Sequence, residues 1–509
     1  MAEVEIIDTE IVPQHSQLKD PIDFNSKLSL SNDVGIATLT SVYPVYTQAE
    51  RETAHRLLVP SAHDVVLGAG WVDTQALDST SDGDASDSKL GRRVSSASSS
   101  SSFSSPSTPP AFSLPAQSTD LLASTKYPSH SDALLVRSCS QGWTLSFELT
   151  SSHPTPLPLA PDEVLISNTA VGLNPVDWKS VSFNFGIPAF PWVLGRDIVG
   201  TIVQTPADNS ERWKSGDRVW TCADSREMRA GAYQRYSVHK KGTLAPVPER
   251  VEDEQAATLG TGLITAAVAL FAFFKLPFAP LSVENQLEKI GLEENLEGRG
   301  WILIYGGGAV TGIYAAQLAS ISKLRVISVA SPSNFSYLSS NGVTECIDRH
   351  QPYESIISSI SSIIASGGGR LRYAMDCVSS STADLCLQAL KDNGADQAEL
   401  ICLAGNPKAE PEQVKVHKIS FSTTFYHPNG EFARDVLEYV TELLKDGALK
   451  PCRPEVLPDG LAGIRAGLEM LREGRAPRAK KLVVRVKDTP AADVTLLGVR
   501  GELGWNGVV

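Results

Sequence analysis

The chain has 509 residues, which at about 150 residues per domain allows about three domains. Hydrophobic residues make up 42% of it and charged residues 20%, a composition that excludes a wholly disordered chain and a membrane bundle. The formal net charge of -13 argues against binding to nucleic acid or to an anionic membrane surface. The longest apolar run, residues 262–274, is shorter than the ~20 residues that a membrane-spanning helix needs.

The cysteines and the first residues both bear on the cellular compartment. Seven cysteines are scattered without any C-x-x-C spacing, which is typical of reduced thiols and not of a disulfide framework or a zinc site. The opening MAEVEIIDTE is acidic and predicts neither a secretory signal nor a basic transit peptide. We therefore expect a cytoplasmic protein that contacts no membrane.

Residues 1–129 differ in composition from the rest of the chain. The segment Ser95–Pro110 reads SSASSSSSFSSPSTPP, so ordering it would cost backbone entropy with almost no burial to offset the cost. We expect a low-complexity, largely disordered extension over residues 1–129. Arg92 and Arg93 precede Ser95 in an R-R-x-S pattern, which makes Ser95 a candidate phosphorylation site.

From about residue 133 the chain shows regular secondary-structure patterns. Short β-rich runs such as ALLVRS, TLSFEL and EVLISNTAVGL predict a small, mostly β domain that extends to about residue 246. After a helical run over residues 254–274, the apolar segments WILIY, LRVISVA, YAMDC and ELICLA alternate with helical stretches, which predicts a doubly wound parallel sheet. The apolar spacing of residues 431–446 predicts a helix that ends at Gly447, and residues 482–486 predict a last strand.

The segment WILIY runs directly into a glycine-rich turn that opens a helix. Glycines let the backbone approach a pyrophosphate closely, and the helix N-terminus offers unpaired N–H groups to it. Tight packing alone also favours glycine in such a turn, but the position inside a strand–helix alternation indicates a dinucleotide site. The predicted cofactor-binding turn comprises Gly306, Gly307, Gly308, Ala309, Val310, Thr311 and Gly312.

The end of the next predicted strand indicates which dinucleotide is bound. NAD sites usually carry an Asp or Glu there to bind the ribose 2′-hydroxyl. This chain has Ser331, Ser333 and Asn334 instead, and Arg349 follows the third predicted strand. Hydroxyl, amide and guanidinium groups suit a 2′-phosphate. The sequence therefore favours NADPH, although a purely solvated role for Arg349 stays open.

Several motifs follow one another in a fixed order over about residues 130–488. They are PDEVLISNTAVGLNPVDWK, WVLGRDIVG, KSGDRV, GAYQRYSV, AATLGTGLITA, the glycine turn and GRAPRAKKLVV. In these motifs the chain resembles the medium-chain dehydrogenases/reductases. Within that superfamily it is most similar to the zinc-free branch of quinone oxidoreductases and fungal trans-acting enoyl reductases, through LNPVDWK, LIYGGG, ASPSNF and MDCVSS.

The resemblance implies an α/β fold. A GroES-like β-rich domain and a Rossmann doubly wound parallel sheet are expected, preceded by the disordered N-terminal extension. The implied domains are the first part of a GroES-like catalytic domain over residues 130–261 and a Rossmann NADPH-binding domain over 262–427. A return to the catalytic domain over 428–488 and a tail over 489–509 follow.

The resemblance also bears on metal binding. Zinc-dependent relatives place their ligands where this chain has Asn174, Arg196 and Thr261. None of these side chains is a usual zinc ligand, and a guanidinium repels the ion. We therefore expect no metal.

By the same resemblance, Asn174, Asp177 and Lys179 lie in a turn that faces the nicotinamide. Hydride addition to an activated double bond places charge on the carbonyl oxygen, and a positioned donor or cation stabilises that charge. We assign this role to Lys179, with the α-carbon protonated by Lys179 or by water. Arg196 is the alternative, unless it only pairs with Asp197. Ala309 and Val310 depart from the family, because quinone reductases commonly carry glycines there.

The leading interpretation is a zinc-independent, NADPH-dependent reductase of an activated C=C bond. Its substrate would be a small-molecule or carrier-bound enoyl compound, and a polyketide synthase would be its partner. A monomer or a homodimer is expected. Two alternatives remain: a quinone oxidoreductase, and a non-catalytic NADPH-binding scaffold whose function lies in residues 1–129.

Overall fold

A computed structural model of the chain describes residues 127–140, 142–206, 212–279 and 300–491. The predicted extension up to residue 126, with its candidate site Ser95, lies outside the described residues, as does residue 492 onward. In the part that is described, no helix is both long enough and apolar enough to cross a membrane.

The β-rich part of the chain is built on a mixed sheet in the order β15-β16-β3-β5-β6-β8, and β7 also pairs with β3. Its strands are β3 (Glu163–Gly172), β5 (Asp197–Gln204), β6 (Arg218–Cys222), β7 (Tyr236–Lys240), β8 (Ala245–Pro246), β15 (Pro454–Leu457) and β16 (Lys481–Arg485). A smaller antiparallel sheet, β2-β1-β4, is formed by β1 (His130–Val136), β2 (Phe147–Pro154) and β4 (Trp192–Val193).

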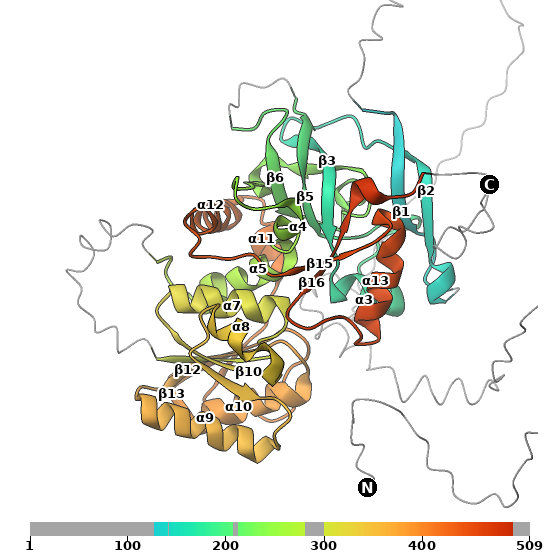
Figure 1. The fold of residues 1–509 in the computed structure, drawn as a ribbon. Coiled ribbons are helices and arrows are strands. Elements are labelled where there is room, and N and C mark those ends of the chain that lie inside the picture. Colours follow the sequence, from blue (N-terminus) through green and yellow to red (C-terminus); the bar gives the residue numbers. More distant parts are fainter. Residues whose placement is uncertain (1–126, 141, 207–211, 280–299, 492–509) are drawn as a thin grey trace, which may run out of the picture. The chain divides into compact units, whose positions relative to one another are not determined.

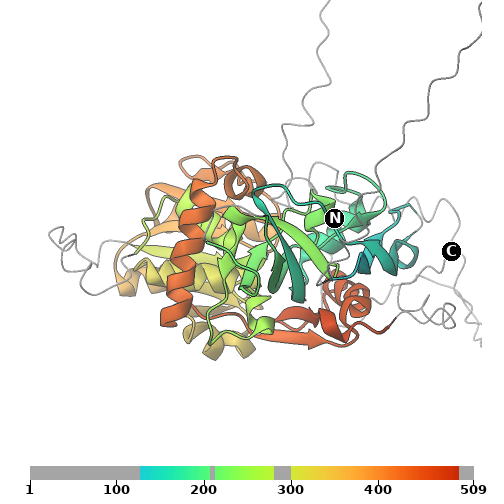
Figure 2. The same cartoon turned by 90° about the horizontal axis from the view of Figure 1, so that it is seen from above.

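The last strands come from the far end of the described chain. Strand β16 pairs antiparallel with β3, with Val484 opposite Val171. Strands β15 and β16, drawn in red, thus complete a sheet that the green strands begin (Figure 1, Figure 2). This return brings residue 481 close to residues 172–174, which lie more than 300 positions earlier in the sequence.

The second sheet is parallel throughout, in the order β11-β10-β9-β12-β13-β14. Its strands are β9 (Trp301–Tyr305), β10 (Arg325–Ala330), β11 (Glu345–Asp348), β12 (Leu371–Asp376), β13 (Gly394–Cys402) and β14 (Lys415–His417). Ile302, Leu303 and Ile304 are fully buried in its centre, because helices cover both faces. The structure confirms the predicted α/β fold class.

Helices occupy both faces of this parallel sheet. Helices α9 (Tyr353–Gly367) and α10 (Ser380–Asn393) cover one face, and α7 (Val310–Ile321) and α8 (Phe335–Ser339) lie on the other (Figure 1). The remaining helices are α3 (Pro175–Phe183), α4 (Asp253–Ala256), α5 (Gly260–Ala267), α11 (Phe421–Phe425), α12 (Glu431–Asp446) and α13 (Ile464–Arg472). The C-cap of α12 is Gly447 with a φ of 76°, which confirms the predicted helix end.

The predicted helical run over residues 254–274 is divided in the structure. It comprises α4, α5 and a π-helical segment, Val268–Phe273. The predicted boundary between the GroES-like and the Rossmann domain, between residues 261 and 262, falls inside α5. The division into domains stays a prediction.

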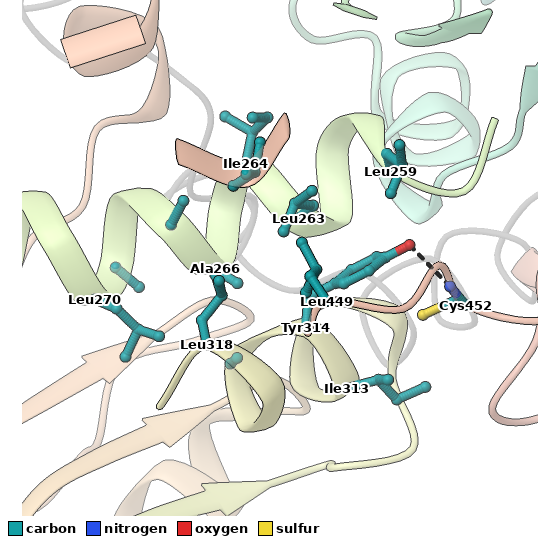
Figure 3. Packing of buried hydrophobic residues seen from close by; sticks show 14 of the residues in the cluster. Leu259, Leu263, Ile264, Ala266, Leu270, Ile313, Tyr314, Leu318, Leu449 and Cys452 are labelled. Atoms are coloured by element: carbon teal, nitrogen blue, oxygen red, sulfur yellow. Dashed lines mark hydrogen bonds between the residues drawn. The ribbon is translucent and has the colours of Figure 1, made fainter. Parts of the chain in front are cut away.

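Helix α5 packs against α7 and thereby fixes the helix that follows the glycine turn (Figure 3). Leu263 of α5, Leu270 of the π-helical segment that continues it and Leu318 of α7 are fully buried in this contact. The buried Tyr314 hydroxyl accepts from the backbone N–H of Cys452 at 3.0 Å and bonds to the Thr258 hydroxyl at 2.8 Å. The glycine turn is therefore attached to a rigid, packed support.

Candidate active site

The glycine turn follows β9, and its backbone adopts a conformation and a close packing that leave no room for side chains at Gly306, Gly307 and Gly312. Gly306 has a φ of 84°, in the left-handed region that favours glycine. A Cβ on Gly312 would lie 2.5 Å from the Gly306 carbonyl oxygen, and a Cβ on Gly307 would lie 1.8 Å from the Ser328 Oγ. The turn therefore depends on glycine at these positions.

Helix α7 begins directly after the turn, with Ala309 as its N-cap in an extended conformation and without a side-chain cap. The first N–H groups of an α-helix, here those of Val310, Thr311 and Gly312, have no partner within the helix. Together with the helix dipole they form a cradle that fits a pyrophosphate. Ala309 has a φ of -73°, so this position does not need the glycine that quinone reductases commonly carry there.

The residues predicted to bind the 2′-phosphate lie together at the ends of β10 and β11. The Arg349 Nε donates to the Ser331 Oγ at 2.8 Å, and both groups are accessible. Asn334 is buried, with its Nδ2 3.5 Å from the position of a Cβ on Gly308, and Ser333 is exposed. The chain thus brings a guanidinium, two hydroxyls and an amide to the edge of the glycine turn, a set that fits NADPH.

Asn174, Asp177 and Lys179 lie on or before the first turns of α3. Asn174 is the N-cap and Pro175 the first helical residue, where its missing N–H costs nothing. The Asp177 Oδ2 accepts the Asn174 backbone N–H at 3.0 Å. This hydrogen bond from the Asn174 backbone to the Asp177 side chain caps the start of α3 and holds it in place.

Arg196 pairs with Asp177. The Arg196 Nη1 lies 2.8 Å from the Asp177 Oδ1, and both side chains are buried. The Tyr233 hydroxyl donates to the Asp177 Oδ2 at 2.8 Å. Burial, reinforced by the neighbouring Asp177 carboxylate, raises the pKa of Tyr233 well above its usual value, so the hydroxyl keeps the proton that it donates. The sequence left a pair between Arg196 and Asp197 open; in the structure Arg196 pairs with Asp177, and Asp197 is held by a different cation.

That cation is Lys481, the first residue of β16, which the sequence analysis missed. Its Nζ lies 2.6 Å from the Asp197 Oδ2 and donates to the Asn174 Oδ1 at 2.5 Å. The Asp197 Oδ1 accepts the Thr261 backbone N–H at 2.6 Å. The sequence does carry a signal for this pair. Asp197 in RDIVG and Lys481 in KKLVV each begin an apolar strand, and buried charges of opposite sign need partners.

The contacts of Asn174, Arg196 and Thr261 show what these side chains bind at the three positions where, by the resemblance, zinc-dependent relatives carry ligands. Asn174 is bound to the Lys481 ammonium, Arg196 is paired with Asp177, and the Thr261 hydroxyl lies 3.7 Å from the Cys222 Sγ. Burial raises the pKa of Cys222 to about 12, which keeps the thiol protonated. Two cations stand beside a donor set that offers no thiolate or imidazole, and this chemistry does not fit zinc.

The buried polar network adjoins the glycine turn. The Ala479 backbone N–H donates to the Gly308 carbonyl oxygen at 3.1 Å, two residues before Lys481. A Cβ on Gly262 would lie 2.6 Å from the Val310 Cγ1, so the residue after Thr261 touches the start of α7. The glycine turn and the start of α7 therefore lie next to the segments that carry Lys481 and Thr261.

Lys179 lies one turn into α3, half-buried, with its Nζ 6.0 Å from the centre of the Trp178 ring. Burial lowers the pKa of the Lys179 ammonium below its usual value. Lys179 forms no ion pair with any residue that the structure describes. A cation in this state is available to stabilise charge on a substrate or to give up a proton.

A cavity of about 720 Å³ lies elsewhere in the described part. It is lined by Phe271–Lys275, by β14, and by residues around α11 and the start of α12. The His417 Nε2 and Glu399 Oε2, 2.5 Å apart, form its most polar contact. None of the predicted site residues lines this cavity, so it is a place distinct from the candidate active site.

Comparisons with known proteins agree with this arrangement. Residues 160–249 match the model of the alcohol dehydrogenase GroES-like domain. The chain is 30% identical over 352 residues to the trans-enoyl reductase resD of Aspergillus sclerotiorum, covering 66% of this chain and 96% of that one. It is 28% identical over 366 residues to lovC of Aspergillus terreus, the enoyl reductase component of lovastatin nonaketide synthase, covering 67% and 94%.

The solved structures agree at the level of the fold. A quinone oxidoreductase of Pseudomonas syringae pv. tomato DC3000 matches with a TM-score of 0.55 at 19% identity, over 69% of this chain and 99% of that one. The match to the GroES-like domain and the likeness to trans-enoyl reductases show an oxidoreductase of the medium-chain dehydrogenase/reductase superfamily. Within that superfamily, the chain belongs to the family of the trans-enoyl reductases.

Proposed function

We propose that the protein is a zinc-independent, NADPH-dependent reductase of a C=C bond conjugated to the carbonyl of a thioester or ketone. The observation that carries the proposal is the likeness to a trans-enoyl reductase over 96% of that relative's length. It is supported by Lys179, a half-buried cation on α3, the helix that starts at Asn174 and Asp177. The proposal places Lys179, Asn174, Asp177 and Arg196 in the active site, in the roles given below.

NADPH supplies a hydride when it is bound. The substrate then takes up a hydride at its β-carbon and a proton at its α-carbon, and negative charge develops on the carbonyl oxygen in between. The Lys179 ammonium stabilises that charge across a short distance in a partly desolvated site. Its lowered pKa makes it a stronger acid than an ordinary lysine, which suits it to deliver the proton.

Asp177 and Arg196 act by positioning in this proposal. Their charges neutralise each other at 2.8 Å within the interior, and both are anchored to the start of α3. Removing one partner would leave an uncompensated buried charge. The pair therefore holds the helix that carries Lys179, and neither group needs to touch the substrate.

The substrate class and the partner rest on the relatives. The relative lovC is named as the enoyl reductase component of lovastatin nonaketide synthase. We propose a carrier-bound enoyl thioester as substrate and a polyketide synthase as partner of this chain. All seven cysteines carry free thiols, which supports a location in the reducing cytoplasm.

A quinone oxidoreductase is the second candidate, favoured by the fold match to such an enzyme. The same site would deliver the hydride to a different acceptor, and the shape of the acceptor pocket decides between them. A scaffold that binds NADPH without catalysis is the third. It would retain the glycine turn while losing nothing on substitution of Lys179.

A screen of NADPH oxidation separates these functions. The purified protein is assayed against enoyl thioesters, enones and quinones, alongside Lys179→Ala and the exposed-lysine control Lys240→Ala. We expect turnover with an enoyl thioester, a loss of about 10²–10³ in kcat for Lys179→Ala, and wild-type turnover for the control. Turnover with quinones alone would move the assignment to the second candidate, and no turnover with any acceptor would favour the scaffold.

A further inference from the structure

We propose, building on the proposed reduction, that the Asn174 side-chain amide donates a hydrogen bond to the carbonyl oxygen of the substrate. We further propose that Lys481 is the positioning residue that holds this amide in its donating orientation. The inference starts from one contact, the 2.5 Å bond between the Lys481 Nζ and the Asn174 side chain.

The chemistry of that contact decides which way the amide faces. An ammonium group has three donors and no acceptor, so the atom that faces it must be the carbonyl oxygen Oδ1. The NH₂ group of Asn174 therefore faces away from Lys481. In most proteins the two orientations of an asparagine amide are hard to tell apart, but here a donor-only partner selects one of them.

The Nδ2 that results is a buried donor without an acceptor. Asn174 is only 3% exposed, and its Nδ2 has no hydrogen-bond partner among the residues that the structure describes. Leaving a buried donor unsatisfied costs about 1–3 kcal/mol. A chain that fixes the amide with a buried lysine and leaves the donor unpaired is arranged to receive an acceptor from a ligand.

The position of the donor suits a carbonyl oxygen. By the family resemblance, Asn174 stands where zinc-dependent relatives carry a ligand of the metal that polarises a substrate carbonyl. Here a hydrogen-bond donor stands at that place, and the Ala479–Gly308 contact joins the network to the cofactor turn. A donor already oriented before binding costs no reorganisation when charge develops on the oxygen.

The cation that orients the amide is itself held firmly. Lys481 is 3% exposed, and the Asp197 carboxylate at 2.6 Å neutralises it. Asp197 is fixed in turn by the Thr261 N–H. Lys481 therefore acts through Asn174 and does not need to touch the substrate, whereas Asn174 contacts it.

Asn174→Asp tests the donor. An aspartate keeps the shape of the side chain and an oxygen toward Lys481, but it replaces the NH₂ group by an acceptor. We expect kcat to fall by about 10²–10³, NADPH affinity to stay within twofold, and the calorimetric affinity for a saturated butyryl thioester with NADP⁺ to fall at least tenfold. If thermal unfolding shows that the Asn174→Asp variant does not fold, Asn174→Ala is used in its place. Its affinity for the saturated thioester is measured by the same calorimetry.

Two variants of Lys481 test the positioning role. Lys481→Arg keeps a donor-only cation and should retain at least a third of wild-type kcat. The neutral double variant Lys481→Gln with Asp197→Asn keeps the site free of unpaired charge, but glutamine accepts as well as donates and no longer selects one orientation. We expect it to lower kcat more than tenfold while KM changes less than threefold.

The outcomes separate this inference from the proposed function. If the wild type reduces an enoyl thioester and Asn174→Asp retains turnover and thioester affinity, the donor role is wrong and the proposed function stands. If the double variant matches Lys481→Arg in kcat, the positioning role is wrong. If the wild type neither turns over nor binds the saturated thioester, both the inference and the proposed function are overturned.

Discussion

At the scale of single residues, Lys179 gives the reaction its pH dependence. Burial lowers its pKa below the 10.5 of an ordinary lysine, and the proposed active form is the protonated one. We therefore expect kcat to fall as the pH rises through this lowered pKa. Lys179→Arg keeps the charge to far higher pH, so its alkaline decline should move out of the measured range.

The check is a kcat profile of the wild type and Lys179→Arg between pH 6 and pH 10. An alkaline decline at the same pH in both proteins would show that a group other than Lys179 titrates. The profile of Lys240→Ala, which removes an exposed lysine, serves as the control.

Cofactor choice also belongs to single residues. Because β10 ends at Ser331 and not at an acid, NADPH should bind at least tenfold more tightly than NADH, or about 1.4 kcal/mol. Arg349→Ala should reduce this preference, and Ser331→Asp should shift it toward NADH by repelling the 2′-phosphate. Titration of the intrinsic tryptophan fluorescence measures each affinity, and equal wild-type affinities for the two cofactors would contradict the assignment.

Single residues also mark what sequence reasoning could reach. The glycines, Ser331 and Arg349 lie in local motifs, and the sequence placed them at one site without knowledge of any long-range contact. The ion-pair partners of Arg196 and Asp197 could not be predicted in this way. Two carboxylates and two cations share one buried space, and the sequence does not say which carboxylate pairs with which cation. Only the return of β16 to β3 shows that Lys481 reaches Asp197 and Asn174.

At the scale of elements, the junction between β9 and α7 depends on Gly312. Alanine normally stabilises a helix relative to glycine by about 1 kcal/mol. At Gly312 its Cβ would lie 2.5 Å from a backbone oxygen that no side-chain rotation can move. We expect Gly312→Ala to lower the free energy of unfolding by about 1–3 kcal/mol and to weaken NADPH binding at least tenfold.

Gly308→Ala is the matched control for stability, because the nearest atom to its Cβ would be the Asn334 Nδ2 at an ordinary 3.5 Å. Urea unfolding should show a change of less than about 0.5 kcal/mol for this variant. If Gly312→Ala is as stable as the wild type, the close approach of α7 to the turn is not the constraint that the geometry indicates.

Strands and helices were largely predictable for a physical reason. The buried strands of the parallel sheet are short β-branched runs, and α12 repeats apolar residues at helical spacing up to a glycine cap, so local sequence suffices. The π-helical segment Val268–Phe273 was not predictable, because its residues are apolar on every side and carry no periodicity that distinguishes it from α-helix. The segment is packed against α12 and the parallel sheet, and the sequence does not show these contacts.

At the scale of the whole molecule, the account predicts an enzyme without metal. Asn174, Arg196 and Thr261 offer no thiolate or imidazole to a zinc ion, and the nearby carboxylates of Asp177 and Asp197 are already paired with Arg196 and Lys481. Elemental analysis of the purified protein should find no stoichiometric zinc, and EDTA should leave turnover unchanged. One zinc per chain, or loss of turnover in EDTA that zinc restores, would overturn the proposed zinc independence.

The central claim is that the protein transfers a hydride from NADPH to the β-carbon of an enoyl thioester. The most direct measurement supplies NADPH deuterated at C4 of the nicotinamide, at each of the two hydrogens in turn, with a crotonyl thioester, and locates the label in the product by NMR. The account predicts that one of the two labelled cofactors delivers deuterium to the β-carbon. It also predicts that a reaction with unlabelled NADPH in deuterated water places deuterium at the α-carbon. Deuterium at the carbonyl carbon, or a product without label from either cofactor, would contradict it.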